Sequence, residues 1–266
     1  MKDYWLLVMF IALLTACGSD NNDVESDVKA NKQSNVSEQY VKDLPITDNS
    51  EVNHYKVLFI GNSHVQPLKS LVSTLIEKGL AEKVVTVEVG HGTFLDVALH
   101  SEDLIEQLQG NSWSHVILQG QKYSQSREHT YPTSATKLWI QRVKHQSATP
   151  MLFPEHPQKG DLVEGQYVHN IHVAIAEEEA SCVAPVGLVW DRALQLKPQL
   201  ELHSSDGNHA TSIGSLLTAL VFYEMITGQS ADLLPFIQEL PADEATQSFL
   251  GQIASQVIAE NENCNY

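Results

Sequence analysis

Four short stretches of the chain gather residue types that could together perform nucleophilic chemistry: 61–64 (GNSH), 90–93 (GHGT), 119–121 (QGQ) and 206–209 (DGNH). A serine hydroxyl becomes a strong nucleophile only when a neighbouring base takes its proton. A histidine can do so near neutral pH, because the unperturbed pKa of its side chain is about 6.5. An aspartate held beside the histidine fixes the imidazole tautomer and stabilises the imidazolium. Ser63, His209 and Asp206 are therefore candidates for nucleophile, base and orienting acid.

Alternating sequence patterns indicate the elements that must position these residues. Short apolar runs predict strands at 55–60, 84–89, 115–118, 150–153 and 181–185. Amphipathic or long apolar stretches predict helices at 68–80, 94–108, 133–145, 162–180, 186–194, 211–227 and 243–260. Strands that alternate with helices favour a parallel sheet covered on both faces.

The four chemical stretches fall where such a sheet binds ligands. In open α/β sheets the ligands lie beyond the carboxyl ends of the strands. The first three stretches directly follow the first three predicted strands, and 206–209 directly precedes the apolar helix expected from 211. We therefore expect all four at one edge of the sheet.

The order and positions of these motifs, over residues 55–228, resemble the SGNH (GDSL-like) hydrolase family. That family has a Gly-Asp-Ser or Gly-Asn-Ser turn after the first strand, a glycine after the second and a final Asp-x-x-His. The resemblance implies a flavodoxin-like three-layer α/β/α sandwich with about five parallel strands. It also implies that Ser63 is the nucleophile and that Asp206 and His209 complete a triad. The oxyanion donors would be the backbone N–H groups of Ser63 and Gly92, with Gly90 as the fallback for the latter, and the amide of Gln121.

The third of these stretches departs from the family pattern. The family has a Gly-x-Asn turn after the third strand, whereas this chain has Gln119 at the position of the Gly and Gln121 at that of the Asn. A glutamine carries the same amide on one more methylene, and an oxyanion donor must lie about 2.7–3.1 Å from the oxyanion. Two interpretations follow: a variant subfamily in which Gln121 donates, which we favour, or a weakened enzyme.

The resemblance implies hydrolysis of a carboxylic ester through an acyl-Ser63 intermediate, without a cofactor or a metal ion. We expect a small-molecule or saccharide ester, with a slight preference for a short acyl group such as acetyl on a saccharide. The alternative is a catalytically inactive domain of this fold that binds glycan or assists envelope assembly. A solute-binding lipoprotein is a third possibility, but it would need a second lobe that the length does not supply.

Several motifs also have simpler structural explanations. Read alone, 206–209 is a turn that caps the next helix, and 61–63 is a strand–helix turn. His169 and His172 have a metal-like spacing, but without a third ligand we expect surface residues. Trp190 is expected in the core rather than in an acyl pocket, and Glu155-His156 is a weak signal. His64 and His91 are expected to line the walls of the site.

The N-terminus has the pattern of an export signal. An apolar stretch of signal-peptide length ends in 14–18 (LTACG), which resembles the bacterial lipobox. We expect residues 1–17 to be a lipoprotein signal with lipidation at Cys17, residues 18–53 to be a disordered polar tether, and residues 54–266 to be the hydrolase domain. The location would be the cell envelope, with the outer membrane favoured. The alternatives are an ordinary signal peptide and an uncleaved anchor helix.

The net charge bears on the class of binding partner, and the cysteines bear on a possible disulfide. The net charge of −17 disfavours nucleic acid, because phosphate binding needs a basic surface. In an oxidising compartment Cys182 and Cys264 can pair. The sequence leaves two alternatives: a disulfide that ties down the C-terminal tail, or a buried thiol beside a frayed end.

Overall fold

The computed structural model describes residues 44–261 and Cys264. The expected signal, Cys17 and residues 18–43 of the expected tether lie outside the described residues. The described part contains one parallel five-stranded sheet with the strand order β2-β1-β3-β4-β5. The strands are β1 His54–Gly61, β2 Val84–His91, β3 His115–Gln119, β4 Thr149–Phe153 and β5 Cys182–Val183. This is the flavodoxin-like order, so the predicted fold class is confirmed.

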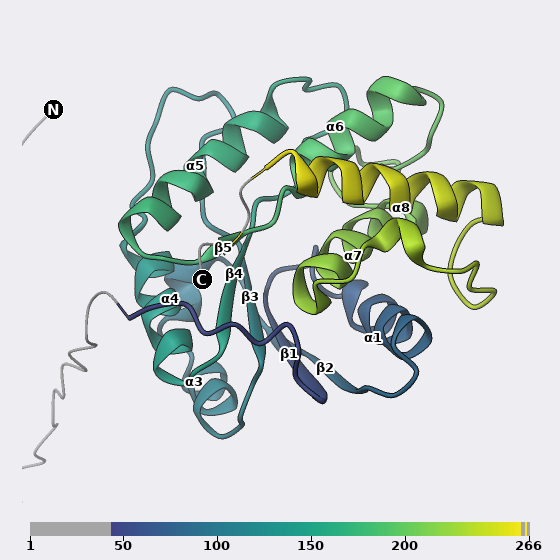
Figure 1. Cartoon of the computed structure of the whole chain (residues 1–266). Coiled ribbons are helices and arrows are strands. Elements are labelled where there is room, and N and C mark those ends of the chain that lie inside the picture. The colour runs from purple at the N-terminus through teal and green to yellow at the C-terminus, as the bar shows by residue number, and fades with distance from the viewer. Residues whose placement is uncertain (1–43, 262–263, 265–266) are drawn as a thin grey trace, which may run out of the picture. The chain divides into compact units, whose positions relative to one another are not determined.

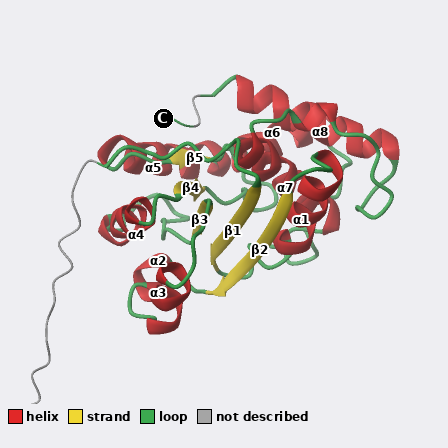
Figure 2. Cartoon of the chain, turned by 60° about the horizontal axis from the view of Figure 1, so that its bottom comes forward, coloured by secondary structure: helices red, strands yellow, loops and turns green. Residues whose placement is uncertain are grey.

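Helices cover both faces of this sheet (Figure 1). They are α1 Leu68–Gly79, α2 Leu95–Ala98, α3 Glu102–Gln109, α4 Ser134–His145, α5 Glu164–Glu178, α6 Val186–Leu196, α7 Ser212–Thr227 and α8 Glu244–Ala259, with a short 3-10 turn, η1, at Ala231–Leu233. Figure 2 shows α2, α3 and α4 on one side of the strands and α1, α7 and α8 on the other. No helix within the described residues is long and apolar enough to cross a membrane.

Alternation along β1 divides the interior into two cores, because successive side chains of a strand point to opposite faces. Val57 and Phe59 face the core that α1, α6, α7 and α8 cover. Leu58 and Ile60 face the core on the side of α2 to α5. Helix α7 is buried on almost every side, which explains why its sequence is apolar all round rather than amphipathic.

The helix expected over 94–108 is in fact two helices, α2 and α3. The break falls at Ser101, whose side chain accepts a hydrogen bond from the backbone N–H of Leu104 at 3.3 Å. Glu102 and Asp103 then occupy the first turn of α3, where the helix dipole favours negative charge. The N-cap at Ser101 and the acidic residues after it therefore start a new helix inside the apolar pattern that predicted a single one.

Residues 44–53, which we expected to be the end of the tether, instead lie against the domain. Ile46 is buried and belongs to the core that α1, α6, α7 and α8 cover. The side-chain amide of Asn49 donates to the carbonyl oxygens of Ser114 and Ser147 and to the hydroxyl of Thr149, at 3.0–3.1 Å. The polar composition of the segment does not reveal these contacts, because the partners lie far along the chain.

The two cysteines form a disulfide between β5 and the C-terminal tail. Cys182 is fully buried, and Cys264 packs against the same core. Of the two alternatives that the sequence left, the structure shows the cross-linked tail.

Candidate active site

Ser63, His209 and Asp206 form a continuous hydrogen-bonded relay at the carboxyl edge of the sheet. The Ser63 hydroxyl lies 2.8 Å from Nε2 of His209, and Nδ1 of His209 lies 2.6 Å from the Asp206 carboxylate. Because the carboxylate only accepts, Nδ1 carries the proton and Nε2 is left to accept from the serine. Ser63 is exposed and His209 is half-buried, so a reagent in solvent can reach both.

A tight turn holds Asp206 in place. One carboxylate oxygen accepts hydrogen bonds from the Ser204 hydroxyl and from the backbone N–H groups of Asn208 and His209, at 2.7–2.9 Å. Together with the bond from the His209 side chain, which is the largest effect, these bonds hold the pKa of Asp206 well below its usual range. The turn does precede a helix, as its composition suggested, but it also aims a charged carboxylate at the histidine.

Ser63 lies on the turn 61–64, which we name the nucleophile turn, and hydrogen bonds of the adjacent residues fix this turn. The side-chain oxygen of Asn62 accepts from the backbone N–H of His64 at 3.1 Å, across Ser63. The carbonyl oxygen of Asn62 accepts from the N–H of Val65 at 3.3 Å, and α1 begins three residues later, at Leu68. This local structure presents Ser63 between the end of β1 and the start of α1.

The loop after β2 touches the loop after β1 at Gly92. A Cβ at position 92 would lie 2.4 Å from the carbonyl oxygen of Gly61, so only glycine fits there. A Cβ at Gly90 would instead meet the end of the Leu104 side chain, on the α3 side. The structure therefore brings Gly92, and not the fallback Gly90, next to the turn that carries Ser63.

Gln121 is not placed to donate to an oxyanion, which corrects the expectation from the sequence. Its Nε2 donates to the carbonyl oxygens of Lys122 and Pro132, at 2.8 and 3.2 Å. Its Oε1 accepts from the hydroxyl of Thr136 at 2.6 Å. An amide nitrogen has two hydrogens, and both are used here. Gln121 is buried and holds the loop that follows β3.

Two residues that the sequence left unassigned reach the site instead. Gln119 ends β3, and its Oε1 accepts from the backbone N–H of Asn62 at 2.7 Å. Its Nε2 donates to Glu155, two residues beyond β4, at 2.6 Å. The pKa of Glu155 is raised to about 7, chiefly by burial; the bond from Gln119 opposes the rise and the charge of Glu164 adds to it. The rule that ligands gather at strand ends, applied to β4 as well, could have found Glu155.

Several aromatic rings pack beside His209. The ring of His64 stacks on that of His209, with centroids 5.2 Å apart. His156 stacks on Trp190 at 3.8 Å, and its Nε2 lies 2.9 Å from the carbonyl oxygen of Asn208. Burial first and the charge of His209 second lower the pKa of His64 to about 4, so the ring of His64 is neutral at neutral pH.

The positions of these rings agree with two expectations from the sequence. His64 lines the site as a wall residue, and Trp190 is fully buried in the core. The expectation for His91 concerns a side chain outside the part of the structure that is described.

A cleft of about 660 Å³ opens beside the relay. Residues on both sides of Ser63 and the residue before His209 contribute to it, with the rest coming from the loops after β2, β3 and β4. The lining residues are Asn62, His64, Phe94, Lys122, Tyr123, Ser124, Gln125, Ser126, His129, Tyr131, Glu155 and Asn208. The exposed aromatic rings of Phe94 and Tyr131 and many hydroxyl and amide groups give this cleft an amphipathic character suited to a polar substrate.

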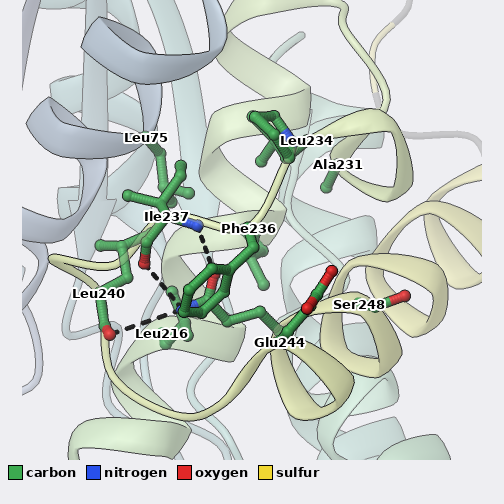
Figure 3. Close-up of a pocket in the computed structure, with 12 residues that line it drawn as sticks. Leu75, Leu216, Ala231, Leu234, Phe236, Ile237, Leu240, Glu244 and Ser248 are labelled. Atoms are coloured by element: carbon green, nitrogen blue, oxygen red, sulfur yellow. Dashed lines mark hydrogen bonds between the residues drawn. The ribbon is translucent and has the colours of Figure 1, made fainter.

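A second, smaller cavity of about 200 Å³ is lined by α1, α7, α8 and the segment between η1 and α8. Figure 3 shows Leu75, Leu216 and Ile237 around it, with hydrogen bonds that fix Ile237 and Leu240 to the side chain of Gln247. None of its lining residues comes from the loops that follow the strands. This cavity therefore takes no part in the relay.

His169 and His172 are buried on α5, which corrects the expectation that they lie at the surface. Nδ1 of His172 lies 2.8 Å from the carbonyl oxygen of Val168, one turn earlier in the helix. Among the residues that the structure describes, no group of three or more potential ligands is arranged to hold a metal ion.

The sequence matches no protein-family model and no curated protein. Its structure is similar to that of a DUF4886 family protein from Bacteroides uniformis, with a TM-score of 0.59 and 14% identity over 80% of this chain and 97% of that one. A putative SGNH hydrolase from Slackia heliotrinireducens has a TM-score of 0.50 and 20% identity, over 65% of this chain and 98% of that one. A catalytic mutant of an acetylxylan esterase from Geobacillus stearothermophilus also has a TM-score of 0.50, with 17% identity over 65% and 94% of the two chains.

At sequence identities this low, the similarity shows the fold of the backbone alone. With TM-scores of 0.59 and 0.50, the described residues, which form a parallel five-stranded sheet with helices on both faces, share the fold of these neighbours. The chain therefore has the fold of the SGNH hydrolases.

Proposed function

We propose that this protein is a serine esterase that hydrolyses a carboxylic ester through an acyl-Ser63 intermediate. The observation that carries the proposal is the relay of Ser63, His209 and Asp206, with its two bonds of 2.8 and 2.6 Å. His209 takes the serine proton as Ser63 attacks the ester carbonyl, and it then returns that proton to the leaving alcohol. Water activated by the same histidine hydrolyses the acyl-enzyme.

The tetrahedral oxyanion is held by the backbone N–H groups of Ser63 and Gly92. The close approach of Gly92 to Gly61 supports this assignment, because it brings the loop after β2 to the nucleophile turn. Gln121 has no part in it, because both of its N–H bonds are used elsewhere. One such donor is typically worth about 3 kcal/mol of transition-state stabilisation.

The substrate that fits best is a short acyl group, such as acetyl, on a saccharide. The polar cleft with Phe94 and Tyr131 exposed at its edge supports a saccharide, since sugar rings present hydroxyl groups and apolar faces together. The similarity in fold to an acetylxylan esterase agrees with this choice.

The test is hydrolysis of p-nitrophenyl acetate, p-nitrophenyl butyrate and acetylated xylan by residues 44–266, with Ser63→Ala as the matched control. The wild type should turn over, and the variant should lose about a thousandfold or more of kcat. Equal inactivity of the two proteins on all three substrates would reject the esterase and leave the inactive glycan-binding domain as the next candidate.

The location of the protein belongs to the proposal as well. Lipidation of Cys17 would tether the domain to a membrane of the cell envelope, since each buried methylene adds about 0.8 kcal/mol. Growth with radiolabelled palmitate tests it: the full chain should incorporate label and sediment with membranes, whereas Cys17→Ser should do neither. Label retained in the variant would reject the lipobox.

A further inference from the structure

A second hydrogen-bonded chain reaches the nucleophile turn from the end of β4. Glu155 accepts from Nε2 of Gln119 at 2.6 Å, and Oε1 of Gln119 accepts from the backbone N–H of Asn62 at 2.7 Å. Asn62 directly precedes Ser63. We propose that Glu155 is a positioning residue which, through Gln119, fixes the turn that presents Ser63; this role rests on the proposed esterase function.

Both ends of the chain determine the orientation of the Gln119 amide. The N–H of Asn62 can only donate, so the oxygen of the amide must face it. The nitrogen then faces Glu155, whose carboxyl group has an acceptor oxygen in either protonation state. Gln119 is fully buried, so an amide left without Glu155 has no solvent to replace the lost bond. It would turn away and release Asn62.

Packing links the same residues a second time. A Cβ at Gly61 would lie 2.4 Å from Oε1 of Gln119 and 2.9 Å from its Cβ. Gln119 therefore lies directly against Gly61, where a side chain would not fit, while it bonds to the next residue, Asn62. A change in the position of Gln119 alters both contacts beside Ser63, and a displacement of about 1 Å at a reacting group can cost a hundredfold in rate.

The surroundings of Glu155 favour a neutral acceptor over a fixed charge. His64 faces it, with Nε2 3.8 Å from the carboxyl group, and Tyr123 and Glu164 act on it from the loop after β3 and from α5. None of these three groups brings a full positive charge at neutral pH, since burial lowers the pKa of His64 to about 4. A glutamine at position 155 can therefore replace the carboxyl group as an acceptor.

Three single variants test the role. Glu155→Leu removes the acceptor at similar volume and should lower kcat for p-nitrophenyl acetate by about a hundredfold with little change in KM. Glu155→Gln keeps the acceptor and should restore kcat to within about threefold of the wild type. Glu164→Leu is the matched control, because Glu164 is also buried and accepts from Tyr123, but it has no bond to the nucleophile turn.

A paired exchange separates positioning from general stability. Gln119→Glu alone sets two carboxyl groups against each other and should lose activity as Glu155→Leu does. Adding Glu155→Gln reverses the direction of the bond, since the carboxylate introduced at position 119 would accept both from the amide introduced at position 155 and from the N–H of Asn62. Activity should then return. Kcat that simply follows Tm across the series, or equal kcat in Glu155→Leu and Glu164→Leu, would overturn the proposal.

Hydrogen exchange across residues 58–66 gives a measurement that needs no turnover. Exchange there should quicken in Glu155→Leu, return to the wild-type rate in Glu155→Gln and stay unchanged in Glu164→Leu. Unchanged exchange in Glu155→Leu would reject the positioning role even in an active enzyme. If the wild type is inactive on every ester, the esterase proposal fails, and the exchange pattern alone then decides whether Glu155 fixes the turn.

Discussion

At the scale of single residues, the amide side chains near the site differ in what they can still bind. Gln121 uses both N–H groups on backbone carbonyl oxygens, whereas Gln119 links the nucleophile turn to Glu155. Sequence position alone favoured Gln121, because it occupies the place of the family asparagine. The number of hydrogen bonds that each amide has already made decides between them, and it assigns Gln121 to the loop and Gln119 to the site.

Replacement of Gln121 by leucine should therefore lower stability and leave catalysis nearly intact. The change leaves the hydroxyl of Thr136, which is fully buried, without its acceptor, and such a loss costs about 1–3 kcal/mol. Kcat for p-nitrophenyl acetate should stay within about threefold of the wild type, because loss of an oxyanion donor would cost about a hundredfold or more. A hundredfold fall in kcat at unchanged Tm would return Gln121 to the oxyanion hole.

At the scale of elements, three loops meet at the carboxyl edge of the sheet because their strands are neighbours. β1 lies between β2 and β3, so the turn with Ser63 is flanked by Gly92 on one side and Gln119 on the other. Asp206 and His209 come from much later in the chain. The Thr211 side chain closes the base of the loop that carries them, because it caps α7 and also donates to the carbonyl oxygen of Glu201, at 2.7 Å.

The contact between the loops after β1 and β2 gives a prediction at this scale. Gly92→Ala places a Cβ against the backbone of Gly61, which cannot move aside as a flexible side chain can. Separation of the two loops should weaken the proposed oxyanion hole and lower kcat by about a hundredfold or more.

Gly90→Ala is the matched control for that measurement. Its Cβ meets the end of the Leu104 side chain, on the face of the sheet that α3 covers. It should lower Tm, with a much smaller effect on kcat. Equal kcat values for the two variants would argue against a role of the Gly92 loop in catalysis.

At the scale of the whole molecule, the fold buries histidines and so keeps them neutral down to a lower pH than in the unfolded chain. Burial lowers the pKa of His64 and His172 to about 4 and that of His115 and His156 to about 3. An unfolded chain binds protons at these side chains below about pH 6.5, whereas the folded chain does not. Their contribution to stability is complete above about pH 6.5 and is lost as the pH falls towards the folded-state pKa values.

Two carboxyl groups act in the opposite sense over part of that range. Burial raises the pKa of Glu155 and Asp191 to about 7, so the folded state holds protons that the unfolded state releases. Their contribution to stability is present below their usual pKa values, near about 4, and is lost as the pH rises towards about 7. They offset part of the histidine effect above about pH 4.5 and none of it below.

The free energy of unfolding should therefore fall more steeply below about pH 4.5 than between about pH 4.5 and 6.5. Each histidine contributes a slope of at most about 1.4 kcal/mol per pH unit. Urea unfolding at a series of pH values measures this slope, and His115→Gln should reduce it, because His115 is fully buried. A slope that this variant leaves unchanged would show that His115 does not titrate as described.

The sequence by itself determined the order of the elements and the residues of the relay. Apolar periodicity located all five strands of the described sheet, and the strand-end rule selected Ser63. The Asp-x-x-His spacing of Asp206 and His209 ahead of the helix expected from 211, with the resemblance to the SGNH hydrolases, selected the other two. These predictions depend on local spacing and on the fixed geometry of a parallel sheet, so the tertiary structure brought the three side chains to the expected edge.

Only the tertiary structure decided which other residues surround the relay. Glu155 reaches Gln119 and residues 44–53 pack on the domain through partners distant in the chain. The bonds of Gln121 within its own loop and the burial of His169 likewise follow from the folded arrangement and not from local spacing. A hydrogen bond or a buried contact needs two residues to meet, and the sequence does not show which residues meet in the folded chain. The sequence therefore predicted the three residues of the relay, while the three-dimensional contacts determined the residues that hold them.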